Sequence, residues 1–352
     1  MESLATIAMP SRHRVIGPWG TPQFAFDPAA AAVARVHPGA TVVVETADCF
    51  GGRLWCEGQV PAEELAAWPL NPVTGPIWID GAEPGDALVV RIAGMEATRD
   101  WAVSCLLPGC GLLADPPTVP GAWADAAARV WLYHRTQGGF ARQDSPEIPW
   151  APFFGTIGVA PAMLAVATEH PGPHGGNLDV PIVGPGAALV LPVFQPGALF
   201  SVGDAHAAQG QGEVGGPALE ISARGTLSFA LIKGAAPPTP LVETADAIAA
   251  IGIGRPMDEA VRAAFEALVE RLARAHGLVP VEAVQLLTLV GGLTLASMVN
   301  SAHTVVASCP KRFLPAPDGG WLVERPPGTR PSSNGKAPHR SYPLGDRPWH
   351  LT

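Results

Sequence analysis

Glycine and proline occur throughout this chain, 40 and 39 times, and divide it into short segments. Both residues interrupt regular helices and favour turns. In the first two-thirds of the chain, the segments between them are rich in β-branched and apolar residues. This pattern predicts strands at 41–46, 87–92, 130–133, 188–193, 198–202 and 227–232. Short strands at regular spacing are typical of sandwiches and barrels, and no alternation of strands with long helices supports a doubly wound sheet.

Helical patterns are confined to the last third of the chain. Apolar side chains recur every three or four residues from Asp258 to His276, and Gly277 follows as a natural C-terminal stop. A second helix is predicted from about Val281 to Ser301, directly after Pro280. This second segment is nearly long enough to span a membrane, but its polar residues and a Gly-Gly pair favour a buried helix of a protein without membrane contact.

These elements predict a β-rich α+β protein. A chain of 352 residues is long enough for about two domains. We expect an N-terminal β-sandwich or barrel region over residues 1–165 and a mixed α+β part over residues 166–322. The second part would carry the site-bearing strands and the helices. Residues 323–352, rich in Pro, Arg, Ser and Gly, are expected to form a loose tail.

The charge of the chain excludes one class of partner. Its formal net charge is −9 and no run of Lys or Arg offsets it, so nucleic acid is not expected to bind. The five cysteines form neither a disulfide framework nor a zinc ribbon, because their number is odd and no C-x-x-C pair occurs. The first ten residues lack the pattern of a signal peptide. We therefore expect a cytoplasmic protein.

The stretch Gly203–Glu220 concentrates reactive side chains among glycines, namely Asp204, His206, Glu213 and Glu220. Carboxylates and an imidazole in a glycine-rich loop suit metal binding or proton transfer and indicate a hydrolytic site. Asp204 and His206 would project from the same side of an extended chain, although a simple Asp–His hydrogen bond in a turn fits the same spacing. The stretch also contains G-x-G-x-x-G, but the residues after Pro217 resemble a strand rather than the helix that a dinucleotide site requires.

Two further polar islands interrupt apolar surroundings. Glu45 and Asp48 end a predicted strand, and Asn177 and Asp179 follow a Gly-Gly pair. Asx residues of this kind are also common in turns, so Asn177 is equally consistent with a turn and a site. No G-x-S-x-G elbow is present. Cys105 or Cys110 with His134 as base is a weaker alternative, because most cysteines are buried and inert.

Taken together and in this order, the islands resemble the acetamidase/formamidase family. The resemblance covers roughly residues 10–310 and rests on six segments: 44–48, 75–88, 152–161, 175–179, 191–193 and 203–220. The chain departs from the family at Gln211, where the family has Asp, and at Gly215 and Pro217, where it often has Cys and Thr. These changes leave the substrate open.

The resemblance implies hydrolysis of short linear amides to a carboxylic acid and ammonia by a homo-oligomer. It implies a divalent metal, zinc or alternatively calcium, and a site formed by matched positions. The predicted roles are catalysis by Glu213 and His206, metal binding by Asp48, Asp204, His206 and Glu220, and substrate binding by Asn177, Asp179 and Gly155. Glu213 would be the general base. Hydrolysis of a carbamate, a lactam or a larger amide, and non-catalytic binding of a small molecule, are the alternatives.

Overall fold

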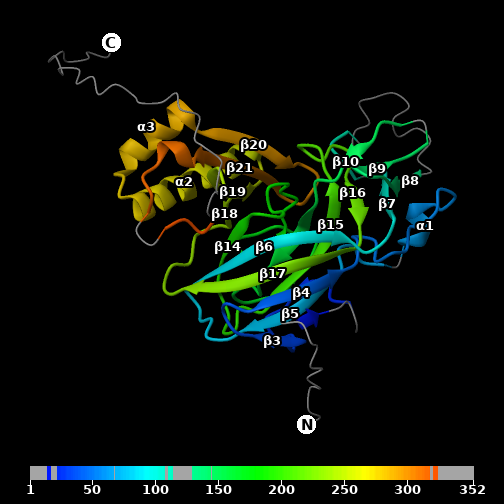
Figure 1. Cartoon of the computed structure of the whole chain (residues 1–352), viewed down its shortest axis with the longest axis horizontal. Coiled ribbons are helices and arrows are strands. Elements are labelled where there is room, and N and C mark those ends of the chain that lie inside the picture. Colours follow the sequence, from blue (N-terminus) through cyan, green and yellow to red (C-terminus); the bar gives the residue numbers. More distant parts are fainter. Residues whose placement is uncertain are drawn as a thin grey trace, which may run out of the picture.

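The computed structural model describes residues 14–16, 22–66, 68–107, 110–113, 129–143, 145–317 and 320–323. Its strands form two large sheets that pack against each other, with two helices at one end of the molecule (Figure 1). The predicted β-rich α+β class is confirmed. The strands predicted around residues 41–46, 87–92, 130–133, 188–193, 198–202 and 227–232 all form, most of them longer than predicted.

The first sheet has nine strands and combines segments from the whole chain. Its order is β1 (Arg14–Ile16), β4 (Thr41–Thr46), β17 (Ala223–Ile232), β6 (Ala87–Ala97), β14 (Ala188–Pro192), β18 (Leu241–Glu243), β19 (Ala247–Gly254), β21 (His303–Pro310) and β20 (Gly292–Ser297).

The second sheet has ten strands and carries the polar islands. Its main order is β10 (Ile148–Pro149), β9 (Gly139–Ala141), β8 (Val130–Arg135), β7 (Trp101–Cys105), β16 (Leu219–Ile221), β15 (Phe200–Ala208), β11 (Phe153–Gly158) and β13 (Gly175–Asn177). Two further strands complete this sheet: β5 (Val73–Ile79) pairs with β15, and β3 (Ala34–Val36) pairs with β5. Strands β2 (Ala25–Phe26) and β12 (Val166–Ala167) form a separate pair. The helical elements are α1 (Pro61–Glu64), α2, α3 and the short 3₁₀ helix η1 (Lys311–Phe313).

The main hydrophobic core lies between the two sheets. In β6, Leu88 and Val90 enter this core, whereas Ala87 and Val89 enter a second core beneath the helices. The central strands of the nine-stranded sheet are therefore buried on both faces and read as continuous apolar runs. Towards the edge, β4 alternates between buried and half-buried residues, as a strand covered on one face should.

Helix α2 (Met257–His276) packs closely on β19 and ends at Gly277, whose left-handed backbone (φ 65°) caps it as predicted. Its buried face includes Ala260, Ala264 and Ala267 in addition to larger side chains. A Cβ added at Gly252 of β19 would lie 1.9 Å from the carbonyl oxygen of Ala260. Glycine on the strand and alanine on the helix thus permit this close approach.

The predicted second helix is wrong over its second half. Helix α3 covers Pro280–Val290 and ends at Gly291, whose backbone is extended (φ −65°, ψ 149°). The chain then enters strand β20, which pairs antiparallel with β21. An apolar run does not by itself distinguish a buried helix from a strand, and here the pairing with β21 decides the outcome.

The predicted division at residue 165 stays a prediction, and both large sheets contain strands from each side of that residue. The predicted tail lies outside the described residues except for Val323. Within the described part of the chain, every helix is too short or too polar to cross a membrane.

We predict that Gly252→Ala destabilises the protein by at least about 2 kcal/mol, because the added methyl group overpacks the contact between β19 and α2. Denaturant unfolding followed by circular dichroism measures this difference. Gly94→Ala in β6 is the matched control, since no atom lies within 4 Å of its added Cβ, and we expect a change within about 0.5 kcal/mol. Equal stability of the two variants would contradict the proposed close contact.

Candidate active site

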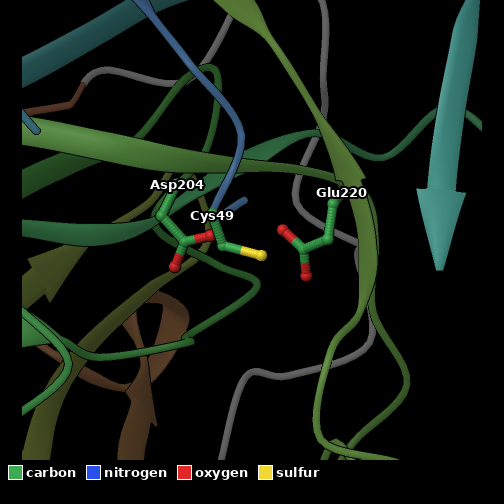
Figure 2. Close-up of side chains that lie close together, drawn as sticks. All are labelled: Cys49, Asp204 and Glu220. Carbon is green, nitrogen blue, oxygen red and sulfur yellow. The ribbon is translucent and has the colours of Figure 1, made fainter. Parts of the chain in front are cut away.

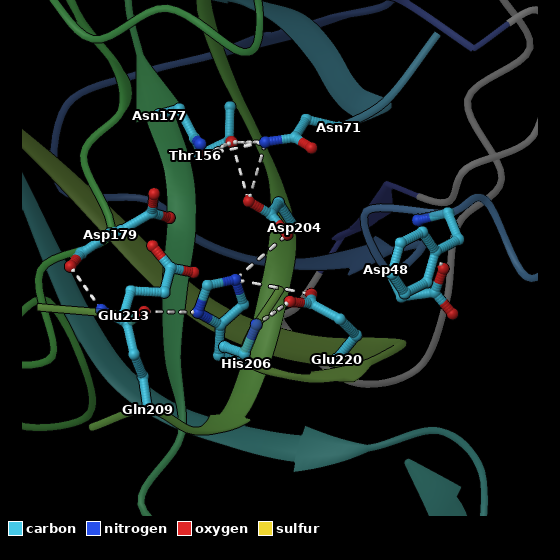
Figure 3. A network of polar contacts seen from close by, with 12 residues as sticks. Asp48, Asn71, Thr156, Asn177, Asp179, Asp204, His206, Gln209, Glu213 and Glu220 are labelled. Carbon is cyan, nitrogen blue, oxygen red and sulfur yellow. Dashed lines mark hydrogen bonds and ion pairs between the residues drawn. The ribbon is translucent and has the colours of Figure 1, made fainter. Parts of the chain in front are cut away.

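Four adjacent strands of the ten-stranded sheet, β16, β15, β11 and β13, position the acidic cluster (Figure 3). His206 of β15 lies opposite Glu220 of β16 on one side and Phe153 of β11 on the other. The next pair of strands places Thr156 opposite Asn177. Strand register thus brings together side chains that lie far apart in the sequence.

The backbone at the site is unusual. Asp204 (φ 52°), Glu213 (φ 49°), Asp179 (φ 49°) and Asn71 (φ 58°) all adopt the left-handed conformation that favours glycine. Among the described residues, only Ala198 and Leu199 share this feature without being glycine. Such conformations cost about 1 kcal/mol or more each and concentrate at functional sites, because surrounding contacts must hold them.

His206 lies at the centre of the cluster and is almost completely buried. Its Nε2 atom lies 3.2 Å from Asp204 Oδ1 and 3.4 Å from Glu220 Oε2. Its Nδ1 atom lies 2.9 Å from Oε1 of Gln209, and the edge-to-face contact with Phe153, at 4.8 Å between ring centroids, fixes the ring plane. The imidazole therefore directs Nε2 towards two carboxylates.

Neutral donors hold the second oxygen of Asp204. Asn71 Nδ2 and Thr156 Oγ1 each lie 3.0 Å from Asp204 Oδ2. The same two groups lie 2.9 and 2.6 Å from Asn177 Oδ1, and the single hydroxyl proton of Thr156 bonds either Asn177 or Asp204 at one time. Asn177 therefore belongs to this network rather than to an isolated turn.

The end of β20 and the turn after it complete the site from the nine-stranded sheet. Ser297 Oγ donates a hydrogen bond of 2.8 Å to Glu213 Oε2, and Asn300 Nδ2 donates one of 2.5 Å to Asp179 Oδ2. Asn177 Nδ2 in turn donates to Asn300 Oδ1 at 3.1 Å. Ser297 and the turn after β20 thus contact two of the buried carboxyl groups.

Burial dominates the electrostatics of the cluster. It raises the pKa of Glu213 and of Glu220 well above the ordinary value, with further increases from Asp179 and Asp204 respectively. Burial also raises the pKa of Asp179 to about 6. At His206, burial opposes the charged form, but Glu220 and Asp204 outweigh it and raise the pKa well above its usual range. In the absence of a cation, the raised carboxyl pKa values thus favour protonated carboxyl groups over buried negative charge.

The donor set fits a divalent cation. Asp179, Asp204 and His206 form one group of potential ligands whose atoms lie within 4.8 Å of one another, and His206, Glu213 and Glu220 form a second. Ligand atoms arranged tetrahedrally at about 2.0–2.2 Å from a zinc ion lie about 3.3–3.6 Å apart, which is close to the separations of 3.2 and 3.4 Å around His206 Nε2. Within the described part of the chain, Asp179 Oδ1 and Glu220 Oε2 are buried and accept no hydrogen bond.

Gly155 forms the floor of this cluster. A Cβ added there would lie 2.7 Å from Asp179 Oδ1 and Asp204 Oδ2 and 2.9 Å from His206 Nε2. The absence of a side chain at Gly155 thus leaves open a space on which three potential ligand atoms converge.

Cys49 adjoins the cluster from the loop after β4 (Figure 2). Its sulfur belongs to a third group of potential ligands with Asp204 and Glu220. Burial, followed by the charges of Glu220 and Asp204, raises the pKa of the thiol well above its ordinary value. Without a cation beside it, the thiol stays protonated.

Asp48 lies apart from the cluster (Figure 3). Its Oδ1 accepts hydrogen bonds of 2.9 Å from the backbone of Phe50 and Gly52, and its Oδ2 lies 2.5 Å from Arg99 Nη1. These contacts shape the turn that carries Cys49, and Asp48 belongs to none of the three groups of potential ligands found among the described residues.

The alternative pair of Cys105 with His134 does not form. On the ladder between β7 and β8, Cys105 lies opposite Val130, whereas His134 lies opposite Trp101, about 13 Å away at 3.3 Å per residue. Cys110 lines the cavity, but burial raises the pKa of its thiol. The strand predicted after Pro217 is β16, at the place where a dinucleotide site needs a helix.

A cavity of about 250 Å³ opens onto the cluster. Its polar lining consists mainly of predicted residues: Asn177, Asp179, Asp204, His206, Glu213 and Glu220. Phe50, Leu70 and Leu107 contribute an apolar wall. The arrangement can bind a small uncharged molecule beside several groups that exchange protons.

Several polar residues of the site were not predicted from the sequence. Gln209 lies within the glycine-rich stretch but carries no charge, and Asn71 and Thr156 lie in otherwise apolar surroundings. Ser297 and Asn300 were included in the second predicted helix, which concealed their role at the end of β20. The signal that was available is the Gly-Gly pair before β20, which interrupts the helical pattern.

Comparison with known proteins agrees with this geometry. The model of the Acetamidase/Formamidase family matches residues 22–170 and 158–248, more than half of the chain. A solved structure of an acetamidase from Yersinia enterocolitica superposes with a TM-score of 0.80 at 31% identity, covering 87% of this chain and 94% of the other.

Two curated relatives match more distantly. An acetamidase from Mycolicibacterium smegmatis is 27% identical over 52% of this chain and 59% of its own length. A formamidase from Methylophilus methylotrophus is 24% identical over 52% of this chain and 56% of its own length. The chain thus spans a little over half the length of these relatives. Because the family model covers most of the core and all of the acidic cluster, the chain belongs to the acetamidase/formamidase family.

Proposed function

We propose that this protein hydrolyses the C–N bond of short linear amides to a carboxylic acid and ammonia, assisted by a divalent metal. The observation that carries this proposal is the position of His206 Nε2, 3.2 and 3.4 Å from oxygens of Asp204 and Glu220. Unbonded carboxylate oxygens and a cavity beside them support it. The names of the relatives, acetamidase and formamidase, agree with this reaction.

We assign the metal to Asp204, His206 and Glu220, with Asp179 as a further oxygen ligand, and prefer zinc to calcium because an imidazole takes part. A bound divalent cation supplies a Lewis acid for the amide carbonyl and increases the acidity of water. Asp48, which we predicted as a ligand, becomes a supporting residue in this proposal, because it pairs with Arg99.

Glu213 is the proposed general base. Ser297 orients its carboxyl group, and burial raises the pKa of that group, which makes its ionised form a stronger base. Glu213 would take a proton from the attacking water and return it to the amide nitrogen, which leaves as ammonia. Asn177 and Asp179 lie at the cavity wall, where they can hydrogen-bond the substrate amide.

One observation favours amides larger than formamide. The cavity of about 250 Å³ has room for several water molecules, and its apolar wall suits an acyl chain.

The predicted homo-oligomer stays a proposal, supported by exposed apolar side chains on α3 and β20, including Val281, Leu289 and Leu293. Location in the cytoplasm also stays a prediction.

We expect purified protein to release ammonia from formamide, acetamide, propionamide and butyramide, and to lose this activity when a chelator removes its metal. Added Zn²⁺ should restore the activity, and ammonia release together with elemental analysis measures both effects. Full activity in metal-free protein would exclude the metal, whereas a metal-loaded protein inactive on all amides would exclude the reaction.

Glu213→Gln should reduce kcat by about 10²–10⁴-fold, the usual contribution of a general base. Metal content and the unfolding midpoint should stay near their original values, because the amide keeps an oxygen that accepts from Ser297. Glu266→Gln, an exposed position on α2, is the matched control with unchanged activity. Retention of full activity by Glu213→Gln would remove Glu213 from the mechanism.

Gly155→Ala should lower both metal content and activity, because the methyl group occupies the space between Asp179, Asp204 and His206. We expect kcat/KM to fall at least about 10²-fold, since a displacement of about 1 Å of a group at the reacting centre can reduce the rate by this factor. Gly210→Ala is the control, because no atom lies within 4 Å of its added Cβ. A metal-loaded and active Gly155→Ala variant would place the site elsewhere.

A further inference from the structure

Gln209 has no charge and no predicted role, yet it contacts three separate parts of the site. It follows strand β15 directly and is half-buried. Its Nε2 atom donates hydrogen bonds to the carbonyl oxygens of Asp179, at 3.0 Å, and of Ala296, at 3.1 Å. Its Oε1 atom lies 2.9 Å from His206 Nδ1 (Figure 3).

These contacts determine the orientation of the Gln209 amide. An amide nitrogen has two N–H groups, and both are used by the two carbonyl oxygens. If the amide were flipped, its oxygen would face these two oxygens without a hydrogen between them. The nitrogen therefore faces Asp179 and Ala296, and the oxygen faces His206.

The orientation of the amide determines in turn the tautomer of His206. Gln209 Oε1 is an acceptor only, so the hydrogen bond at 2.9 Å requires a proton on Nδ1. A neutral imidazole with a proton on Nδ1 has its lone pair on Nε2. Nε2 is the atom that lies between Asp204 Oδ1 and Glu220 Oε2.

The loop that carries Gln209 is itself fixed. The backbone N–H of Gly212 contacts the carbonyl oxygens of Leu295, at 3.1 Å, and Ala296, at 3.0 Å, and Met298 N donates to the carbonyl of Gly212. The same strand end thus holds both the backbone of the loop and the side chain of Gln209. The Gln209 side chain, held in this way, can fix the orientation of the His206 ring, because few other conformations are open to it.

We propose that Gln209 is a positioning residue that holds His206 in the Nδ1–H tautomer and so presents the Nε2 lone pair to a divalent cation. This inference rests on the proposed metal site and adds a residue that acts through His206. Gln209 touches neither substrate nor cation in this arrangement. It also links the orientation of His206 to the backbone of Asp179, a second proposed ligand.

Gln209→Met tests the proposal, because methionine keeps the length of the side chain and removes its hydrogen bonds. We expect the Kd for Zn²⁺, measured by competition with a chelator on metal-free protein, to rise about 10–100-fold. Gln195→Met is the matched control. Gln195 Nε2 also donates to two backbone carbonyls, those of Pro161 at 3.0 Å and Ala162 at 2.8 Å, but this side chain contacts no histidine. Its Kd should stay unchanged.

A second measurement includes a wild-type result that does not depend on the folding of any variant. In zinc-loaded, ¹⁵N-histidine-labelled wild-type protein, His206 should show a protonated, exchange-protected Nδ1 and an unprotonated Nε2. That Nδ1 proton should persist in Gln195→Met and lose its protection in Gln209→Met. An unprotonated Nδ1 in the wild type, or an unchanged Kd for Zn²⁺ in a folded Gln209→Met variant, would overturn the proposal.

Failure of the two proposals can be told apart. If the wild type hydrolyses amides with zinc and Gln209→Met binds zinc equally well, the role of Gln209 is wrong and the proposed function stands. If the wild type binds no zinc, the proposed metal fails, and the presentation of Nε2 to a cation fails with it. Exchange protection of the Nδ1 proton in metal-free protein then still reports whether the hydrogen bond to Gln209 forms.

Discussion

Four carboxyl groups buried in one cavity, with one imidazole between them, set the main constraint on this structure. Transfer of a charged carboxylate from water to the protein interior costs several kcal/mol, and a single imidazolium can balance only one such charge. Neutral donors such as Asn71, Thr156 and Asn300 stabilise individual oxygens without removing the excess charge. The cluster must therefore take up protons or a cation, and these are the two properties that a hydrolytic site needs.

The scaffold holds this unfavourable cluster together through strand register. His206, Glu220 and Asn177 belong to neighbouring strands whose pairing allows no slip, because a shift by one residue would turn each side chain to the opposite face. The left-handed residues Asp204 and Glu213 add local strain, which the hydrogen bonds around them compensate. Burial of apolar side chains between the two sheets supplies the free energy that offsets these costs.

The sequence predicted much of this arrangement because turn residues and apolar patterns are local signals. Helix α2 and the strands around the acidic islands follow from such patterns. The glycine-rich stretch 203–220 placed His206, Glu213 and Glu220 in one site, and family resemblance added Asn177 and Asp179. The sequence did not predict that Asp48 would pair with Arg99, because that contact joins separate segments of the chain. Nor did it separate α3 from β20, since the pairing of β20 with β21 is a tertiary effect that an apolar run does not encode.

That last error matters because the end of β20 and the turn after it contact three different groups of the site. Ala296 accepts a hydrogen bond from Gln209, Ser297 donates one to Glu213, and Asn300 donates one to Asp179. The family model matches residues up to 248, so it includes the acidic groups but not these partners. Changes in residues 296–300 would alter how the carboxyl groups and the imidazole are oriented without replacing any of them. The end of β20 and the turn after it are thus part of the candidate site, although they supply none of its acidic groups.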